Sequence, residues 1–283
     1  INAAGRMGDA ASALALFSET DEKAVFDLSA RLTAYNQERQ QRCDELYAQA
    51  KAKLALRGAY GRVIMLWDES WNSGFVGIVA ARLAEEYGRP VILFVNNGGT
   101  LKGSARSIEG VNIFEALRAC SEFISEFGGH SQAAGVNVSE ENFALLEEAM
   151  NNYMEEKYTA EDFIPTIYIS GGFGGENAIR LSHELEMFEP YGVGNKRPLF
   201  CAEVTACKPR PIKPLSSHLT FKCGALEMMY FGGAKYTEVL SSPAPKKLVF
   251  EYNVSRFRGR EYIRGFVRDV IYDSDCGAYA GDY

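Results

Sequence analysis

The sequence predicts an α/β domain that follows a long helix and precedes an all-β domain. Three patterns carry this prediction. Apolar residues recur at helical spacing through residues 21–57, strand-like and helix-like segments alternate through residues 58–160, and short alternating runs separated by turn residues fill residues 164–273. A chain of 283 residues is long enough for two domains.

The long helix is predicted over Asp21–Leu56 and ends before Gly58, because apolar positions follow one another at three- and four-residue spacing with polar residues between them. A helix of this length spans roughly 50 Å, which exceeds the interior of a small domain. We therefore interpret residues 21–57 as a connector between two domains. One arm of a coiled coil is the alternative, although Arg39 and Arg42 interrupt the apolar stripe.

The α/β domain, residues 58–160, contains a strand–helix–strand unit, an order typical of α/β folds. We expect the Gly-Gly-His sequence at 128–130 to follow the C-terminal end of a helix. The predicted elements from residue 9 onward are a helix over Asp9–Ser18, the connector, a strand over Arg62–Trp67, a turn over Asn72–Gly77 leading into a helix that ends near Gly88, strands over Pro90–Val95 and Leu101–Ser107, a helix over Asn112–Phe127, and a helix through Phe143, Leu146 and Met150.

The all-β domain, residues 164–273, follows a linker over Tyr158–Phe163. Short strands at this spacing indicate a small barrel of about five strands or a sandwich. Arg256–Arg260 is predicted as a hairpin tip, Glu176–Phe188 as a helix that packs on the barrel, and residues 274–283 as a disordered tail. The predicted strands cover Ile167–Ile169, Phe200–Thr205, Leu219–Cys223, Glu227–Phe231, Leu248–Ser255 and Glu261–Val270.

The composition excludes several classes of protein. A hydrophobic content of 47% and a charged content of 24% are typical of a globular chain. No apolar run approaches the roughly 20 residues that span a bilayer, and no secretory leader is visible. The six cysteines are scattered without a C-x-x-C pair, which argues against a zinc site and a disulfide framework. We expect a cytoplasmic protein with no membrane partner.

The charge distribution suggests a polyanionic ligand for the last domain. The whole chain has a net charge of −7, but the segment Glu203–Asp269 holds twelve Lys and Arg against six Asp and Glu. A small barrel with basic and aromatic faces is the oligonucleotide-binding (OB) type. The candidate strand-binding residues are Lys208, Arg210, Lys213, Lys222, Arg256, Arg258, Arg260 and Arg264, accompanied by His218, Tyr252 and Tyr262.

Two motifs in the α/β domain predict a phosphate-ester site. Leu101–Ser107 groups Lys102, Arg106 and two hydroxyls around a glycine, and Gly128–Gly135 sets His130 after two glycines. Backbone amides at glycines, together with Arg, Lys and His, are suitable donors to phosphate oxygens. The alternative is that the glycines form a tight turn and that His130 caps the preceding helix.

The segments INAAGRMGDA, ESWNSGFVGIVAARLAEEYGRPVILF, LKGSARSIEGVNIFEAL, GGHSQAAG and EPYGVGNKRPLF, in this order, resemble the RecJ-like exonucleases of the DHH phosphoesterase superfamily. The resemblance runs from Ile1 to about Asp273. It implies a DHH-associated domain over 58–160 and an OB domain over 164–273. Residues 1–20 then correspond to the tail of the DHH catalytic domain, and we interpret the chain as a portion lacking most of that domain.

The resemblance also implies an activity. RecJ-like enzymes degrade single-stranded DNA from its 5′ end, using two Mn²⁺ or Mg²⁺ ions held by Asp and His residues of the DHH domain. The sequence contains no D-H-H triplet, so we expect no metal ligand in this chain and an inactive fragment. Single-stranded DNA is the expected ligand, with a single-strand-binding protein and a helicase as further candidate partners.

Site residues follow from the same resemblance. Arg106 and His130 are expected to contact phosphates, assisted by Ser104, Ser107, Gly128 and Gly129. Lys102 is either a further phosphate ligand or a solvated charge. Asn2 and Arg6 would face the metal site of the intact protein. Asn72 departs from the family pattern, in which a His is usual, and an amide cannot titrate.

Two other readings of the chain remain open at this point. One is a DHH-family phosphodiesterase that acts on oligoribonucleotides or cyclic dinucleotides, although such short substrates need no extended strand-binding surface. The other is a non-catalytic module that binds single strands.

Overall fold

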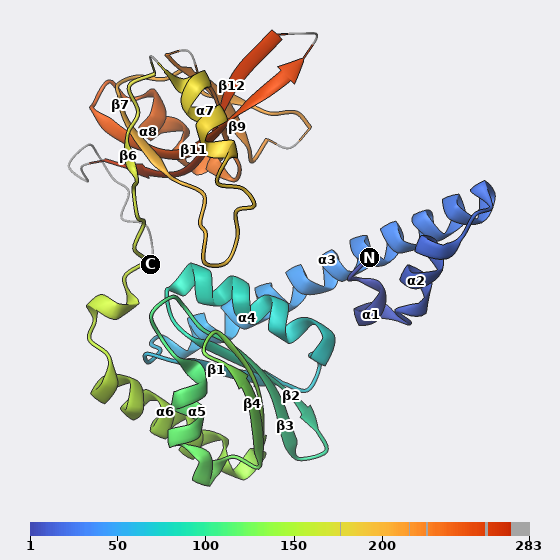
Figure 1. The fold of residues 1–283 in the computed structure, drawn as a ribbon. Helices are drawn as coiled ribbons and strands as arrows, with labels where there is room; N and C mark the ends of the chain where they lie inside the picture. The colour runs from blue at the N-terminus through green and yellow to red at the C-terminus, as the bar shows by residue number, and fades with distance from the viewer. Residues whose placement is uncertain (176, 215, 225, 258–259, 273–283) are drawn as a thin grey trace. The chain divides into compact units, whose positions relative to one another are not determined.

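The computed structural model describes residues 1–283 except 176, 215, 225, 258–259 and 273–283. The chain divides into two compact units, residues 1–165 and the chain from Thr166 onward, coloured blue to green and yellow to red in Figure 1. Among the described residues, no helix has both the length and the apolar character to cross a membrane.

The first unit begins with α1 (Ala4–Met7), α2 (Ala11–Ser18) and the long helix α3 (Glu22–Arg57). The Asp21 side chain caps α3 by accepting a hydrogen bond from the amide of Ala24, and Gly58 ends the helix with a φ of +70°. Leu32 of α3 packs with α1 and α2, whereas Leu46, Ala50 and Leu54 pack against the following sheet and helix. The long connector helix is therefore confirmed, and its two halves belong to two apolar clusters.

A five-stranded sheet follows, with the order β1-β2-β3-β5-β4. β1 and β2 are parallel and the other neighbouring strands are antiparallel. The elements are β1 (Ile64–Asp68), α4 (Ser73–Tyr87), β2 (Val91–Asn97), β3 (Thr100–Arg106), α5 (Ile113–Ala119), the 3-10 turn η1 (Ser121–Phe123), β4 (Glu126–His130), β5 (Ala133–Ser139), η2 (Glu140–Asn142), α6 (Phe143–Lys157) and η3 (Glu161–Phe163).

Helices cover the two faces of this sheet to different extents. α5 and α6 lie on one side of the sheet and α4 lies on the other (Figure 1). The α5–α6 side buries residues of β1, β2, β3 and β5, and Phe127 of β4 packs against them partly buried. On the α4 side, the buried strand residues come from β1 and β2 only, as in Ile64, Leu66, Val91 and Leu93.

Two predictions for this unit are wrong. Asn72–Gly77 is not a turn, because the Asn72 side chain accepts a hydrogen bond from the amide of Gly74 at 2.8 Å and α4 begins at Ser73. The helix predicted over Asn112–Phe127 ends at Ala119. Ile124 is extended, and Phe127 lies on β4 opposite Val136 of β5. The Gly-Gly-His sequence thus lies on a strand, and His130 does not cap a helix.

The second unit is built on a seven-stranded sheet with the order β6-β7-β11-β12-β10-β9-β8. Five strands have five or more residues, the number expected for the barrel, and two have only two. Among the described residues, no pairing joins β8 to β6. The elements are β6 (Gly171–Gly172), α7 (Ala178–Glu186), β7 (Phe200–Val204), β8 (Arg210–Pro211), β9 (Leu219–Cys223), β10 (Leu226–Tyr230), η4 (Gly233–Tyr236), α8 (Thr237–Ser241), β11 (Lys246–Phe257) and β12 (Arg260–Ile271).

Two predictions for this unit are wrong, and two others fall on residues that the structure does not describe. Ile167–Ile169 is not a strand, since the pairing to β7 is made by Gly171 and Gly172. Tyr252 is unsuitable for contacting a ligand, because it is only 2% exposed and packs among Phe173 and Phe200. The predicted disordered tail lies outside the described residues, and so does the tip of the hairpin at 258–259.

The ion pair between Lys53 and Asp68 joins α3 to the end of β1 at 2.7 Å. Burial favours the neutral acid, but hydrogen bonds from Lys53 and Ser70 outweigh it and lower the pKa of Asp68 from 3.8 to about 2. Because this pKa is depressed in the folded state, the stabilisation is present above pH 3.8 and is lost as the pH falls towards 2.

We expect Asp68→Asn to lower the free energy of unfolding by roughly 1 kcal/mol at pH 7, allowing for solvent screening. The difference from the parent should shrink as the pH falls from 3.8 towards 2. Urea titrations of both proteins across this range measure it. Glu69→Gln, at the exposed neighbouring carboxylate, is the control, and a difference independent of pH would contradict the assignment.

Tyr252 offers a second test of stability. Its hydroxyl is buried and has no hydrogen-bond partner among the described residues. Removing an unsatisfied polar group avoids its desolvation, so Tyr252→Phe should raise the free energy of unfolding by about 1 kcal/mol. Tyr191→Phe is the matched control, because the Tyr191 hydroxyl donates to the carbonyl of Leu185 at 2.6 Å and its loss should destabilise the unit. Urea unfolding followed by circular dichroism compares the two variants.

Candidate functional site

The candidate site lies on the part of the sheet face that α4 leaves open. Along β3, Leu101, Gly103 and Ala105 point into the core, so Lys102, Ser104 and Arg106 share the opposite face. These three residues lie directly opposite Val95, Leu93 and Val91 of β2, which α4 covers. α4 also contacts β3, where Gly77 lies against Ser104 and Arg106, so the face opens along β3 at the edge of the helix and continues uncovered by α4 over β5 and β4.

The strand register arranges the candidate residues in rows across the three strands. Arg106 lies opposite Ala133, which in turn lies opposite His130. Ser104, Gly135 and Gly128 form the next row. Two strand spacings separate the ends of each row, roughly 10 Å. The floor between Arg106 and His130 consists of glycine and alanine, so a ligand there meets backbone rather than bulky side chains.

Arg106 is held in place at one end of this floor. Its Nη1 donates to Ser104 Oγ at 3.1 Å and to the carbonyl of Ala105 at 2.7 Å. Burial, and then the proximity of Arg6, lower the pKa of the Arg106 guanidinium. Two arginines near one another repel, and an anion between them relieves that repulsion.

Arg6 reaches this region from α1. Its Nη1 donates to the carbonyl of Gly74 at 2.7 Å, at the beginning of α4. Asn2 lies just before α1 and lines, with Arg6 and Arg39, a groove of about 760 Å³ beside α3. The structure thus brings Asn2 and Arg6 to the same side of α4, and places Arg6 close enough to Arg106 to influence its pKa.

Gly77 of α4 contributes to the site, although no sequence motif identifies it. A Cβ atom at this position would lie 2.8 Å from Ser104 Oγ and 2.9 Å from Arg106 Nη2. The absence of a side chain therefore allows the guanidinium to lie against the helix. The sequence carries no signal for the contact between Gly77 and Arg106, because these residues lie 29 positions apart, one on a helix and the other on a strand.

The remaining motif residues fall into two groups, those that already make local contacts and those that are exposed. The Ser107 hydroxyl donates to the carbonyl of Val111 at 2.7 Å, and Gly129 adopts a φ of +150° where a side chain would strike the backbone of β5. Both serve the local structure, and their role towards phosphate stays a prediction. Gly128 has open space above it, and Lys102 and His130 are exposed.

The donor set at the arginine end of the site does not fit a divalent metal ion. Arg6 and Arg106 are cations, and Mg²⁺ and Mn²⁺ require mainly carboxylate and other oxygen ligands. Within the part of the chain that the structure describes, no three His, Cys, Asp or Glu side chains gather as a metal site. The arrangement suits an anion.

The candidate residues of the second unit lie at several places. Arg264 pairs with Glu227 at 3.3 Å, and Lys222 lies opposite Glu227 on β9. Lys208, Arg210 and Lys213 are exposed on the segment before β9. Arg256 lies opposite Glu261, and Arg260 lies opposite Phe257, on β11 and β12. Arg258 lies outside the described residues.

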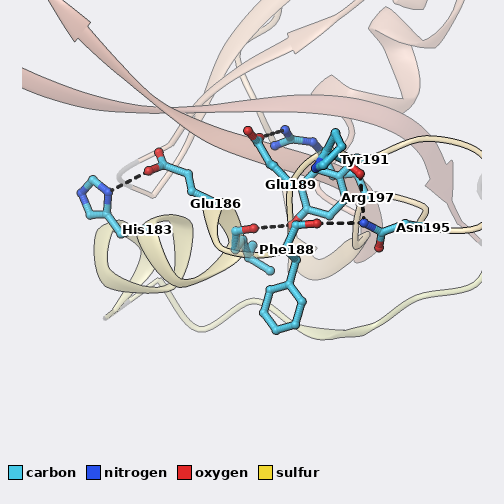
Figure 2. Close-up of polar contacts among 9 residues, drawn as sticks. His183, Glu186, Phe188, Glu189, Tyr191, Asn195 and Arg197 are labelled. Carbon is cyan, nitrogen blue, oxygen red and sulfur yellow. Dashed lines mark hydrogen bonds and ion pairs between the residues drawn. The ribbon is translucent and has the colours of Figure 1, made fainter.

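The EPYGVGN sequence, residues 189–195, lies in a loop that is held by hydrogen bonds and an ion pair with nearby residues (Figure 2). The Asn195 side chain donates to the carbonyls of Phe188 at 2.8 Å and Pro190 at 3.1 Å. Arg197 pairs with Glu189 at 2.9 Å and lies 4.6 Å from the Tyr191 ring centroid. The polar side chains of this motif are thus bound to nearby backbone carbonyls and to Arg197.

Comparisons with known proteins agree with this architecture. Residues 58–156 match the DHHA1 domain, and residues 176–269 match the RecJ OB domain. The RecJ exonuclease of Bacillus subtilis is 28% identical over 278 residues, which cover 95% of this chain and 35% of that protein. The Thermus thermophilus RecJ is 31% identical over 206 residues, 71% of this chain and 29% of its own length.

Solved structures give the same result. The crystal structure of Thermus thermophilus RecJ with Mg²⁺ superposes with a TM-score of 0.77 at 26% identity, covering 96% of this chain and 42% of that one. The same protein with Mn²⁺ gives a TM-score of 0.74 at 25% identity. The chain spans about a third of the length of the curated relatives it matches.

A DHHA1 domain followed by an OB domain of the RecJ type defines the class of protein. The chain belongs to the RecJ family, and the predicted α/β and OB fold classes are confirmed.

Replacement of Gly77 tests the contact with Arg106. In Gly77→Ala the new methyl group should displace the guanidinium, which is the end of a flexible side chain, while alanine favours the helix. We expect an unchanged or higher thermal midpoint together with roughly 10-fold weaker binding of a labelled oligonucleotide. Unchanged binding would show that Arg106 has no part in holding the ligand.

Proposed function

We propose that this chain is the strand-binding part of a single-strand-specific DNA exonuclease. The observation that carries the proposal is the open face of β3, β5 and β4, where Arg106 and His130 lie at the two ends of a glycine and alanine floor with Arg6 nearby. The names of the relatives support DNA as the polymer and a single strand as its form.

The geometry suits a phosphodiester backbone. The Arg106 guanidinium presents a planar set of N–H donors that match two phosphate oxygens, and the imidazole of His130 can donate to the next group along the strand. Because the floor carries no side chain larger than a methyl group, the DNA strand can approach the backbone of β5 and β4 closely. Cations fixed beside the phosphate also stabilise the negative charge that grows on its oxygens during hydrolysis.

Hydrolysis itself is assigned to the rest of the intact protein. The relatives were solved with Mg²⁺ or Mn²⁺, so we propose that the intact enzyme uses one of these ions, with ligands supplied by a DHH domain. This chain contributes positioning and charge neutralisation. The 5′-to-3′ direction and the association with a single-strand-binding protein or a helicase belong to the same proposal.

The expected location is consistent with the described thiols. Cys43, Cys120, Cys201, Cys207 and Cys223 are all free. Unpaired thiols fit the reducing cytoplasm, where a bacterial-type DNA exonuclease would meet its substrate.

Fluorescence anisotropy with a labelled single strand and a duplex competitor tests the proposed function. Binding should prefer the single strand and weaken as salt rises, because phosphate contacts release counterions. Failure to bind either nucleic acid at low salt would overturn the proposal.

Arg106→Ala and His130→Ala test the individual phosphate contacts. Arg106→Ala should weaken single-strand binding by roughly 10-fold and reduce the slope of log affinity against log salt by about one. His130→Ala should have a smaller effect in the same direction. In the intact enzyme each variant should lower turnover with little loss of stability.

Arg118→Ala is the matched control, since Arg118 lies on α5 at the covered side of the sheet and remains exposed. Unchanged binding and cleavage in both test variants would remove Arg106 and His130 from the site.

A further inference from the structure

The open face of the first sheet continues beyond the glycine row into another row of side chains. Lys102 of β3 lies opposite Asn137 of β5, which in turn lies opposite Glu126 of β4. Their strand neighbours Val136 and Phe127 pack into the core, so Asn137 and Glu126 lie on the open side together with Lys102. We call Lys102, Asn137 and Glu126 the third row.

The third row differs in charge from the Arg106 end of the face. Glu126 and Lys102 are both exposed. Within the described part of the chain, Glu126 has no cationic partner and Lys102 has no carboxylate partner. A phosphate beside Glu126 would be repelled, so the phosphate of a bound nucleotide belongs near Arg106 and His130. The third row is therefore available to an uncharged part of the nucleotide.

The spacing of the rows suits a single nucleotide. Arg106 and Lys102 are four residues apart on one strand, which corresponds to roughly 13 Å. The row between them contains Gly135 and Gly128, and a Cβ atom at Gly128 would meet nothing within 4 Å. A nucleotide whose phosphate lies at Arg106 can therefore lay its sugar over the glycines and bring its base to the third row.

The polar atoms of the third row form an ordered pattern of donors and acceptors. The Asn137 side chain donates from Nδ2 to Glu126 Oε2 at 3.0 Å. Because the amide nitrogen faces the carboxylate, Asn137 Oδ1 and Glu126 Oε1 are left as acceptors for a ligand. The Lys102 ammonium has only donors. Across the face from β3 to β4, the row thus presents a donor followed by two acceptors.

We propose that the third row binds the Watson–Crick edge of a guanine base, in the nucleotide whose phosphate lies at Arg106. This inference rests on the proposed function, because it assumes a DNA strand on the open face. The guanine edge carries the acceptor O6 followed by the donors N1–H and N2–H, which complement the pattern of the row. Base edges are discriminated by hydrogen bonds of this kind.

The other bases match the third row less well. Adenine and cytosine have an acceptor ring nitrogen at the centre of this edge, opposite the oxygen of Asn137. Thymine has an oxygen opposite the carboxylate of Glu126. The consequence is a preference for guanine at one position of the strand. From sequence, Lys102 is either a phosphate ligand or a solvated charge, and this arrangement instead directs its ammonium to O6.

The test measures binding of deoxynucleoside monophosphates to the 283-residue chain by isothermal titration calorimetry. dGMP is compared with dTMP and with dIMP, whose base differs from guanine only in lacking the N2 amino group. The variant is Glu126→Gln. Glu122→Gln is the matched control, because it removes the same charge from an exposed carboxylate on η1, in the same unit but outside the third row.

We expect the parent to bind dGMP roughly 10-fold more tightly than dIMP or dTMP, because only guanine can donate an amino group to Glu126. This difference should largely disappear in Glu126→Gln and persist in Glu122→Gln. Lys102→Ala should weaken dGMP and dIMP equally, since both carry O6. Arg106→Ala should weaken all three ligands by the same factor, since each has a phosphate.

Three results would overturn the guanine site while leaving the proposed function in place. They are equal affinities of the parent for dGMP and dIMP, a ratio of these affinities that Glu126→Gln leaves unchanged, and absence of binding of all three monophosphates. The second is the result expected if the bond between Asn137 and Glu126 only holds the edge strand β4. Absence of binding to a labelled single strand would overturn the proposed function together with the guanine site.

Discussion

The extent of α4 over the first sheet is the constraint on which the candidate site depends. Ile64, Leu66, Val91 and Leu93 need cover on that face. On the same face, β3, β5 and β4 present a floor of small residues surrounded by the polar side chains of Lys102, Ser104, Arg106, Asn137, Glu126 and His130. α4 is fixed by the Asn72 cap and by packing against α3, and Gly77 lets it lie against Arg106. A helix shifted further across the sheet would cover the arginine, and a helix shifted away would expose β2.

The same sheet shows how one strand can serve both a core and a site. On β3, Gly103 faces inward, where a Cβ atom would lie 2.5 Å from the Phe94 ring and 2.9 Å from Val136. Two large residues thus fill the core beneath the strand, while Ser104 and Arg106 lie on its open side. Because the pleat alternates with a period of two, a register shift of one residue would bury the arginine and expose the core. The packing of Phe94 therefore also fixes the position of Arg106, the candidate residue for binding phosphate.

Sequence patterns identify the helices and strands that are encoded by the spacing of apolar residues within one segment of the chain. The spacing of Leu46, Ala50 and Leu54 predicts the long helix, and the apolar runs predict most strands within one to three residues. The Asn112–Phe127 prediction fails because Cys120, Ile124 and Phe127 follow helical spacing, although they contact the core from a helix end, a turn and a strand. The motifs correctly direct attention to Arg106 and His130, but their alignment in one row depends on pairing through β5, which no local pattern encodes. Gly77 and the burial of Tyr252 are likewise properties of the tertiary structure.

The ion pairs on the OB sheet have a consequence for the entropy of binding. Arginine has many rotamers, and immobilising such a side chain at an interface costs about 0.5–1.5 kcal/mol. Glu227 and Glu251 already restrict Arg264 and Arg268 in the free protein. Much of this loss of rotamer freedom thus accompanies folding. The arginine side chains are therefore already ordered before a ligand binds to the OB sheet. Less of the interaction energy of the ligand is then spent on ordering these side chains.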